Sequence, residues 1–299
     1  MSPALDDRST GRPMDAAGFG SAPRDEPARP VASLQWIAAA AATARALGLD
    51  RIGDELEGEA LVADTVVLLP ARDRPDASWA AAIAARLAAS RLRHLVLVSS
   101  AEIVEPSHRH AGFSNEHGLR ARRPTNAVAR SWMELEERVV QALGESITRC
   151  TILRPTAMPV AAGRDLWSRL VSRRVALVPA GFDPSVQWLE PAALLRVIRR
   201  LSLSEPPTTD SPRILHVAPP DVEPLRAALR RRGVLAIPVP TLLVRLVKRL
   251  AGARPDEAAY LRYPWTVSGR AAERCMEAAP PSSTGPEHRP APDPLDVND

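Results

Sequence analysis

The chain has 299 residues, 45% hydrophobic content and a net charge of +4, which is enough apolar material to bury a domain core and argues against disorder throughout. Its arginines form no run interleaved with aromatic side chains and no 18 apolar residues run together, so neither a nucleic-acid partner nor a transmembrane segment is predicted. Cys150 and Cys275 match no disulfide framework or metal spacing and no signal peptide opens the chain, so a reducing, cytoplasmic setting is predicted.

The N-terminal part of the chain contains three segments of different composition. Residues 1–30 are polar and rich in Asp, Arg, Gly and Pro, and we expect them to be disordered. Residues 32–47 are rich in alanine and predict a helix, because alanine has the highest helix propensity. Asp64 then introduces Thr65–Leu69, a continuous apolar run stopped by Pro70, which is typical of a strand buried on both faces.

Strands and helices alternate through the middle of the chain. The pattern predicts a helix over 78–92, a strand over His94–Val98, a helix over 126–143 and a strand over 149–153. This alternation is typical of βαβ units, and hence of a parallel sheet with helices on both faces. We therefore predict an α/β fold built on a truncated, Rossmann-like, doubly wound parallel sheet.

After residue 160 the elements shorten, and a small C-terminal α/β lobe is predicted over 161–277, following a Rossmann-like domain over 31–160. The lobe's predicted elements are strands over 173–178, 186–189 and 214–217, and helices over 191–201, 222–232 and 241–250. Residues 278–299 are rich in Pro, Ser and acidic side chains and are predicted to be a disordered tail.

Five short stretches occur in a meaningful order: I-G-D-E-L at 52–56, D-T-V-V-L-L-P-A at 64–71, L-V-S-S-A at 97–101, T-I-L-R-P-T at 151–156 and Y-P-W-T-V-S-G-R at 263–270. Together they resemble the extended short-chain dehydrogenase/reductase family, the NAD-dependent epimerases and dehydratases. The resemblance implies NAD(P) as cofactor and a nucleotide-sugar bound by the lobe. It also implies that Asp54, Ala71 and Pro155 lie beside the cofactor and that Ser100 is the catalytic serine.

The chain departs from that family at its first strand, which should run into a Thr-Gly-x-x-Gly-x-x-Gly turn. Those glycines let the backbone approach the dinucleotide pyrophosphate at a helix N-terminus. Nothing upstream of Asp54 matches, and Gly18 and Gly20 are flanked by prolines and follow no predicted strand. We therefore predict that the sheet lacks its first βαβ unit and that the cofactor site is lost, the alternative being a first strand encoded before Met1.

The family's catalytic Tyr and Lys, four residues apart, are also absent. Aligning N-A-V-A-R-S-W at 126–132 with the family's Asn-Pro-Tyr-x-x-x-Lys places Val128 at the tyrosine and Trp132 at the lysine, and Glu136 matches an acidic position often seen there. Valine has no proton to give and an indole carries no charge, so this pair cannot act as general acid and base. The chain's one lysine, Lys248, and its two tyrosines lie near the C-terminus.

Three functions follow from this pattern. The first is a pseudoenzyme without oxidoreductase activity that binds a ligand or a partner, as a homodimer or with an active paralogue, through the helices over 78–92 and 126–143. The second is an NAD(P)-binding sugar-nucleotide epimerase, dehydratase or reductase with non-standard catalytic residues. The third is a membrane-surface protein, because 241–250 is a basic amphipathic segment with Arg245 and Lys248 on one face.

One loop carries residues that occur in metal sites. His108, His110 and His117 share it with Glu105 and Glu116, and a His-x-His pair with carboxylates is able to bind a transition metal. Loops rich in His, Ser and Asn are more often solvated than metal-bound, so no metal site is predicted.

Overall fold

The computed structural model describes residues 34–38, 64–71, 75–90, 92–106, 113–116, 124–144, 148–203, 212–240 and 255–277. All of them belong to one of the two compact units of the chain, Ala32–Asp299. Several predictions lie outside the described residues: those for 1–30, 241–250 and 278–299, and those for Asp54, His108, His110 and His117.

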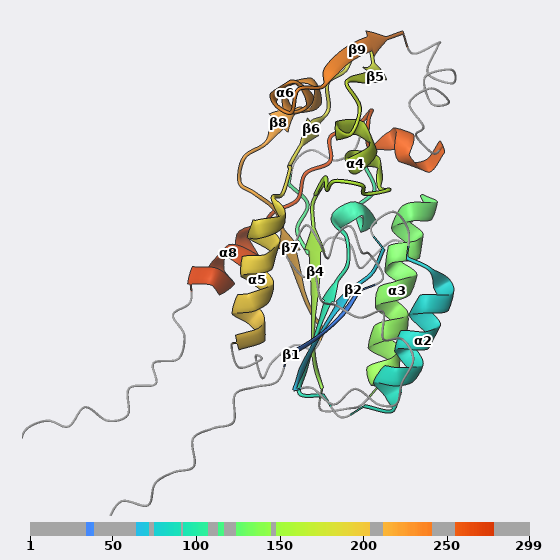
Figure 1. Ribbon diagram of the computed structural model, residues 1–299, viewed down its shortest axis with the longest axis vertical. Helices are drawn as coiled ribbons and strands as arrows, with labels where there is room; N and C mark the ends of the chain where they lie inside the picture. Colours follow the sequence, from blue (N-terminus) through green and yellow to red (C-terminus); the bar gives the residue numbers. More distant parts are fainter. Residues whose placement is uncertain are drawn as a thin grey trace, which may run out of the picture. The chain divides into compact units, whose positions relative to one another are not determined.

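Five parallel strands form the central sheet, in the order β1-β2-β3-β4-β7 (Figure 1). They are β1 (Leu34–Ala38), β2 (Thr65–Leu69), β3 (His94–Val98), β4 (Arg149–Pro155) and β7 (Arg213–Val217). Val66 lies opposite Leu95, and Leu97 lies opposite Ile152. The predicted Rossmann-like α/β sheet is confirmed, and β7 adds to it a strand from the chain after residue 160.

Strand β1 corrects the prediction of a helix over 32–47. It pairs in parallel with the whole of β2, with Leu34 opposite Thr65. High alanine content favours a helix locally, but the Trp and Ile in L-Q-W-I-A favour a strand, and pairing with β2 buries Ile37 and Ala38. The prediction that the sheet lacks its first strand is therefore wrong, because a strand from the start of the chain lies beside β2.

Helices cover both faces of this sheet (Figure 1). On one face α2 (Ala77–Ala88) packs against α3 (Ala127–Leu143), and on the other face lie α5 (Pro191–Leu203) and α8 (Arg270–Glu277). Alternate strand residues enter the two cores, as expected for strands buried on both faces. The α2–α3 core includes Trp79, Ile83 and Trp132 with Leu68, Leu95 and Leu97, and the α5–α8 core includes Leu194, Ile198 and Ala272 with Val67, Val96 and Val98.

Helix α3 begins and ends where local chemistry dictates. The side-chain Oδ1 of Asn126 accepts hydrogen bonds from the backbone N–H groups of Val128, at 2.8 Å, and Ala129, at 3.4 Å, which satisfies donors at the helix start. Gly144 ends the helix with φ of 52°, a conformation that glycine adopts more easily than other residues. The helix predicted over 126–143 is confirmed to within one residue.

Two small sheets and short helices form a second group of elements around a core cluster of their own, and we call this group the lobe. In it β5 (Val175–Pro179) pairs in parallel with β9 (Leu235–Val239), and β6 (Ser185–Val186) pairs antiparallel with β8 (Glu223–Pro224). The helical elements are α4 (Leu166–Val171), α6 (Leu225–Arg231) and the 3₁₀ turn η3 (Pro255–Ala259). Trp167 and Trp265 stack in its core with ring centroids 5.7 Å apart. Among the described residues, no helix is long and apolar enough to cross a bilayer.

The predictions for 161–277 need adjustment: the strand predicted over 214–217 is β7 of the central sheet, and the helix predicted over 191–201 is α5, which covers that sheet. The strand predicted over 186–189 shrinks to β6, and Trp188 forms only an isolated bridge to Ala157. The helix predicted over 222–232 begins at Leu225, after the short strand β8. The sequence pattern did not indicate α4, β9 or α8, because these elements have only five to eight residues, which is too short for a periodic pattern to be recognised.

Candidate functional site

The carboxyl ends of β2, β3 and β4 meet at one edge of the sheet, which is where open α/β sheets bind ligands. Three residues singled out by the sequence come to this edge: Ala71 follows β2, Ser100 follows β3 and Pro155 ends β4. Asp54 lies outside the described residues. The structure thus gathers these three residues at the position where a cofactor would cross the strand ends.

Ser100 serves as a structural cap. It is fully buried, and its Oγ accepts a hydrogen bond from the backbone N–H of Glu102 at 3.1 Å. This bond caps the 3₁₀ turn η1 (Ala101–Ile103), which contacts α3. The hydroxyl is therefore engaged with its own backbone and is closed to solvent.

Val128 and Trp132 lie on the inner face of α3, one turn apart. Trp132 is 0% exposed, and both side chains belong to the apolar core that also contains Ile103 and Leu97. At the two positions that align with a phenol and an ammonium, this chain has hydrophobic core packing. Neither side chain is placed to exchange a proton with a ligand at the strand ends.

The next turn of α3 carries a buried ion pair. Glu136 accepts two hydrogen bonds from Arg154 of β4, Nε to Oε1 at 2.9 Å and Nη2 to Oε2 at 2.5 Å, and both side chains are almost completely buried. Such a bidentate geometry is the strongest form of this interaction. Burial, with a further contribution from the Glu136 charge, raises the pKa of the nearby Cys150 thiol to about 12, so this cysteine is not a nucleophile at neutral pH.

On β7, His216 lies opposite Arg154 in the sheet. The backbone N–H of His216 donates to Glu116 at 3.1 Å. Burial lowers the pKa of the His216 imidazole to about 4; the Glu116 charge opposes this shift and the Arg154 charge adds to it. The ring is therefore neutral at pH 7.

The two carboxylates of the loop considered for metal binding hold protein groups in the structure. Glu116 accepts from the backbone of His216, and Glu105 accepts from the backbone N–H of Asn126 and the hydroxyl of Thr125. Within the described part of the chain no group of three His, Cys, Asp or Glu side chains is placed to hold a metal ion. The histidines of that loop lie outside the described residues.

The turn η3 and the residue after it close over this region, which the sequence did not indicate. The fully buried Tyr260 donates its hydroxyl to the carbonyl of Glu102 at 2.6 Å, two residues beyond Ser100. Burial raises the pKa of the Tyr260 phenol well above its ordinary value, so it stays protonated. This tyrosine, distant in sequence from the aligned position, is therefore engaged in a structural contact.

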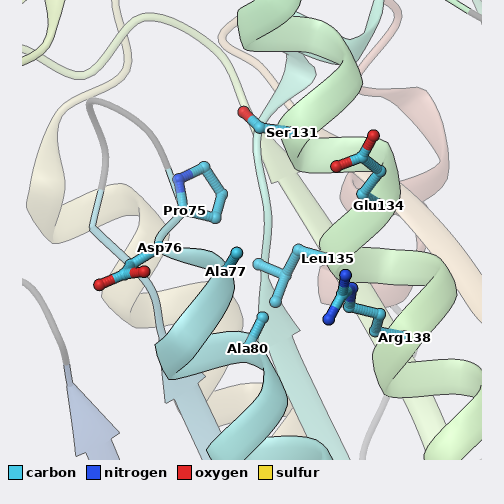
Figure 2. Close-up of a pocket in the computed structure, with 8 residues that line it drawn as sticks. All are labelled: Pro75, Asp76, Ala77, Ala80, Ser131, Glu134, Leu135 and Arg138. Carbon is cyan, nitrogen blue, oxygen red and sulfur yellow. The ribbon is translucent and has the colours of Figure 1, made fainter.

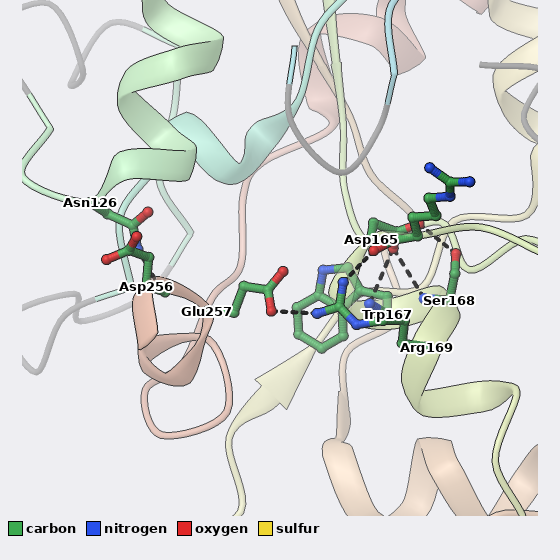
Figure 3. A network of polar contacts seen from close by, with 8 residues as sticks. Asn126, Asp165, Trp167, Ser168, Arg169, Asp256 and Glu257 are labelled. Atoms are coloured by element: carbon green, nitrogen blue, oxygen red, sulfur yellow. Dashed lines mark hydrogen bonds and ion pairs between the residues drawn. The ribbon is translucent and has the colours of Figure 1, made fainter. Parts of the chain in front are cut away.

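A second set of polar contacts ties η3 to both parts of the structure (Figure 3). The Asn126 side-chain amide donates to the carbonyl of Asp256, and Arg169 of α4 forms an ion pair with Glu257. Asp165 caps α4 by accepting from the backbone N–H of Trp167 at 3.1 Å. Together these contacts hold the lobe against the start of α3, beside the strand ends.

Two cavities open elsewhere on the surface. The first, about 350 Å³, lies between α2 and α3, as Figure 2 shows, and the second, about 870 Å³, lies between α5, α8 and the chain after β7. The first is lined by Pro75, Asp76, Ala77, Ala80, Ser131, Glu134, Leu135 and Arg138. Neither cavity is lined by Ser100, Val128 or Trp132.

Comparison with known proteins places the fold. No protein-family profile and no curated protein matches the chain. Among solved structures, RMD from Pseudomonas aeruginosa complexed with NADPH matches with a TM-score of 0.58 and 12% identity, covering 84% of this chain and 93% of that one. MoeE5 in complex with UDP-glucuronic acid and NAD matches with a TM-score of 0.51 and 14% identity, covering 75% of each chain.

A third structure extends the set. UDP-glucose 4-epimerase from Thermotoga maritima with UDP-glucose matches with a TM-score of 0.50 and 8% identity, covering 71% of this chain and 70% of that one. Sequence identities this low support a conclusion about the fold alone. At that level they confirm the resemblance seen in the sequence, and the chain has the fold of the extended short-chain dehydrogenase/reductase structures.

Proposed function

We propose that this protein binds a ligand or a protein partner on the fold of the NAD-dependent sugar-nucleotide enzymes and does not carry out their oxidoreductase chemistry. The observation that carries the proposal is the packing of Trp132. It occupies the position that the sequence resemblance assigns to the catalytic lysine, it is 0% exposed, and it fills the core between α3 and the sheet. A cation at this position would lower the pKa of a catalytic phenol, and an indole does not do so.

The remaining hydroxyl groups support the same conclusion. Ser100 caps η1, and Tyr260 is bound to the carbonyl of Glu102 inside the lobe core. Loss of a general acid or base alone costs about 10²–10⁴ in rate, and here both partners of the pair are absent. Hydride transfer by this protein should therefore be far slower than by an enzyme with the Tyr and Lys in place.

The sequence after β1 bears on whether the protein can bind a dinucleotide cofactor. In the resembled family this strand leads into the glycines that approach the pyrophosphate, whereas here it continues A-A-A-A-T over 39–43. A methyl group at each glycine position obstructs close approach of the backbone to phosphate. We therefore expect NAD(P) to bind weakly or not at all, and we take a nucleotide-sugar as the first ligand to test, since two of the similar structures hold UDP-sugars.

A protein partner is the second expectation, and the helices α2 and α3 are its proposed contact surface. The exposed side of α2 carries small side chains that let another helix approach closely, and these are Ala81, Ala82, Ala85, Ala88 and Ala89. Beside them, the 350 Å³ cavity presents Asp76, Glu134 and Arg138 as polar partners (Figure 2). The partner would be a second copy of this chain or a catalytically active relative.

Equilibrium binding tests the proposal. Calorimetric titration of the full chain with NAD⁺, NADP⁺ and UDP-glucose should show no binding of either dinucleotide, and thermal unfolding should be unchanged by them. A ligand at 100 times its Kd would stabilise the fold by about 2.7 kcal/mol, which is readily measured. Tight NAD⁺ or NADP⁺ binding would contradict the loss of the cofactor site.

One observation favours an alternative, an NAD(P)-binding epimerase, dehydratase or reductase with other catalytic residues. Strand β1 is present beside β2, as part of a fold shared with a protein solved with NADPH. If dinucleotide binds, two assays separate the functions: oxidation of NADPH in the presence of nucleotide-sugars detects a reductase, and conversion of the nucleotide-sugar itself detects an epimerase or dehydratase, whose overall reaction leaves the dinucleotide unchanged. Turnover that survives substitution of Ser100 by Ala would require catalytic groups other than the aligned serine.

A further inference from the structure

The larger of the two cavities, about 870 Å³, is a groove between α5 and α8, which lie side by side on one face of the sheet (Figure 1). One wall is a single face of α8 and the residue before it, at the helical spacing i, i+3, i+4, i+7 and i+8: Gly269, Ala272, Glu273, Met276 and Glu277. The start of α5 and the chain after β7 also line it. Sites for small molecules have volumes of about 300–1,000 Å³. We call this groove the α5–α8 cavity.

Most of the inner surface of this cavity is apolar. Trp188 and Leu189, just before α5, line it together with Val197 of α5 and Val217 of β7, and all four side chains are buried. Met276 of α8 is 37% exposed and belongs to the same lining. An apolar side chain that is exposed inside a concave, mostly apolar site offers surface for a ligand to cover.

Contacts within the protein hold the walls in place. A Cβ atom at Gly269 would lie 2.5 Å from the carbonyl oxygen of Ala218, so this glycine lets the start of α8 pack directly against the chain after β7. The guanidinium of Arg232 lies over the Trp188 ring, 4.8 Å from its centroid, and forms an ion pair with Glu190 at 2.7 Å. The α5–α8 cavity is therefore preformed, as binding sites for small molecules usually are.

The charged side chains that line the cavity are mostly acidic. Five of the seven are carboxylates, although in the whole chain cationic residues outnumber acidic residues by 39 to 35. Two of the five have counter-ions, because Glu190 pairs with Arg232 and Glu223 pairs with Arg231. Three exposed carboxylates of the lining form no ion pair within the residues that the structure describes: Asp221, Glu273 and Glu277. Of the two lining cations, Arg196 alone is left without a carboxylate in that part of the chain, so unpaired negative charge prevails.

We propose that the α5–α8 cavity binds a small organic cation, an amine or guanidine carried on an apolar body. The apolar body covers Met276 and the buried side chains around it, and the cationic group lies among the three unpaired carboxylates, where its hydrogen bonds are charge-assisted. A ligand that carries phosphate, such as a nucleotide-sugar, is disfavoured because the same carboxylates repel it. The site is distinct from the strand ends, and this inference stands independently of the proposed function.

Three probes with one naphthyl body separate the effect of charge from that of apolar contact in calorimetric titrations of the full chain. 2-Naphthylethylamine should bind, 2-naphthylethanol should bind about tenfold more weakly because it lacks the cation, and 2-naphthylacetate should show no measurable binding. Added salt should weaken binding of the amine and leave that of the alcohol unchanged. Absence of amine binding, or equal binding of the amine and the alcohol, overturns the proposal.

Substitutions in the lining locate the probe. Glu273→Gln and Glu277→Gln should each weaken binding of the amine about threefold and leave the alcohol unchanged, because each removes one carboxylate charge. Arg196→Gln should strengthen binding of the amine about threefold, because it removes a nearby positive charge. Met276→Ser should weaken binding of both probes about fivefold, because both lose apolar contact.

Glu137→Gln is the matched control, because Glu137 is an exposed carboxylate on α3, across the sheet from this cavity. It should bind both probes like the unmodified protein, and melting temperatures should be the same for all the charge variants, since their side chains are exposed. Equal weakening by Glu137→Gln and the two α8 variants would show attraction to the overall surface charge and overturns the proposal. So does amine binding that none of the lining substitutions changes, because the probe would then lie elsewhere.

Discussion

At the scale of single residues, the most unusual feature is ionisable groups inside the hydrophobic core. Glu136 and Arg154 satisfy each other bidentately, and the neutral His216 beside them keeps the low pKa that burial gives it. A buried ion pair is costly to assemble and adds little net stability, but removing one partner leaves an uncompensated charge. The ion pair is thus more informative about position than about stability, because it holds α3 against β4.

The ion pair gives the first prediction. Glu136→Gln should lower the free energy of unfolding by about 3–5 kcal/mol, because Arg154 is left buried without its counter-ion. The double variant Glu136→Met with Arg154→Met should recover most of that loss, since no charge is then buried. Urea unfolding measures both, and a double variant as unstable as the single one would show that packing, not charge, is responsible.

Two buried histidines should make the stability of the folded protein depend on pH. Burial lowers the pKa of both His216 and His94 to about 4, against about 6.5 in an unfolded chain. Between these values the unfolded chain takes up protons that the folded protein does not, so stability is complete above pH 6.5 and is lost as the pH falls toward 4. The slope should approach about 1.4 kcal/mol per pH unit for each histidine.

Unfolding midpoints measured between pH 7 and pH 4.5 check this dependence. His216→Gln should remove about half of the slope whatever it does to stability at pH 7, and His94→Gln should remove the other half. A variant that is destabilised equally at every pH, with the parent's slope retained, would contradict the assignment.

At the scale of elements, the start of α3 is the point where most of the candidate site meets. Asn126 caps the helix with its carbonyl oxygen and reaches the carbonyl of Asp256 with its amide. Its own backbone N–H and the hydroxyl of the preceding residue, Thr125, donate to Glu105 of the segment after β3. One residue therefore orders the helix, the end of β3 and the lobe turn η3 together.

The two roles of Asn126 are separable. Asn126→Ala should lower the free energy of unfolding by about 1–2 kcal/mol, because it removes both the cap and the link to η3. Asn126→Asp keeps a capping oxygen and loses only the donor to Asp256, so it should cost less. Thermal unfolding of the two variants compares them, and equal losses would mean that the cap contributes little.

The elements also show how much of the fold could be predicted from the sequence. The strands over 65–69 and 94–98 and helix α3 were predictable, because each has a periodicity or an apolar run with a clear local end. Strand β1 was mistaken for a helix because its alanine-rich surroundings favour one, and only pairing with β2 overrides that preference. The hydrogen bond from Tyr260 to Glu102 joins residues 158 positions apart, and no local sequence pattern predicts such a contact.

At the scale of the whole molecule, the described residues form a three-layer arrangement, with helices on both faces of the parallel sheet (Figure 1). Three solved structures share this fold at identities of only 8–14%, so the fold tolerates the replacement of most side chains. The outer layers are consequently the surfaces on which a changed function would be built. The alanine-rich exposed side of α2 is one of them.

Association through α2 and α3 is the prediction at this scale. Sedimentation velocity should show a dimer, and Ala85→Arg should dissociate it, because a long charged side chain on the exposed side of α2 prevents close helix contact. Ala192→Arg, on the exposed side of α5 across the sheet, is the matched control and should stay dimeric. A parent protein that is monomeric at all concentrations would rule out self-association and leave a different chain as the partner.

Strand β7 is synthesised long after its neighbour β4, and this delay affects the nascent chain. Strand β4 ends at Pro155, and its outer neighbour begins at Arg213. At 5–20 residues per second, a ribosome needs about 3–12 seconds to make the intervening chain. Throughout that interval the nascent sheet has an open edge of unpaired amides and carbonyls, which is a template for aggregation. A product truncated between these strands should therefore accumulate in inclusion bodies, and full-length yield should depend on chaperones that shield nascent chains.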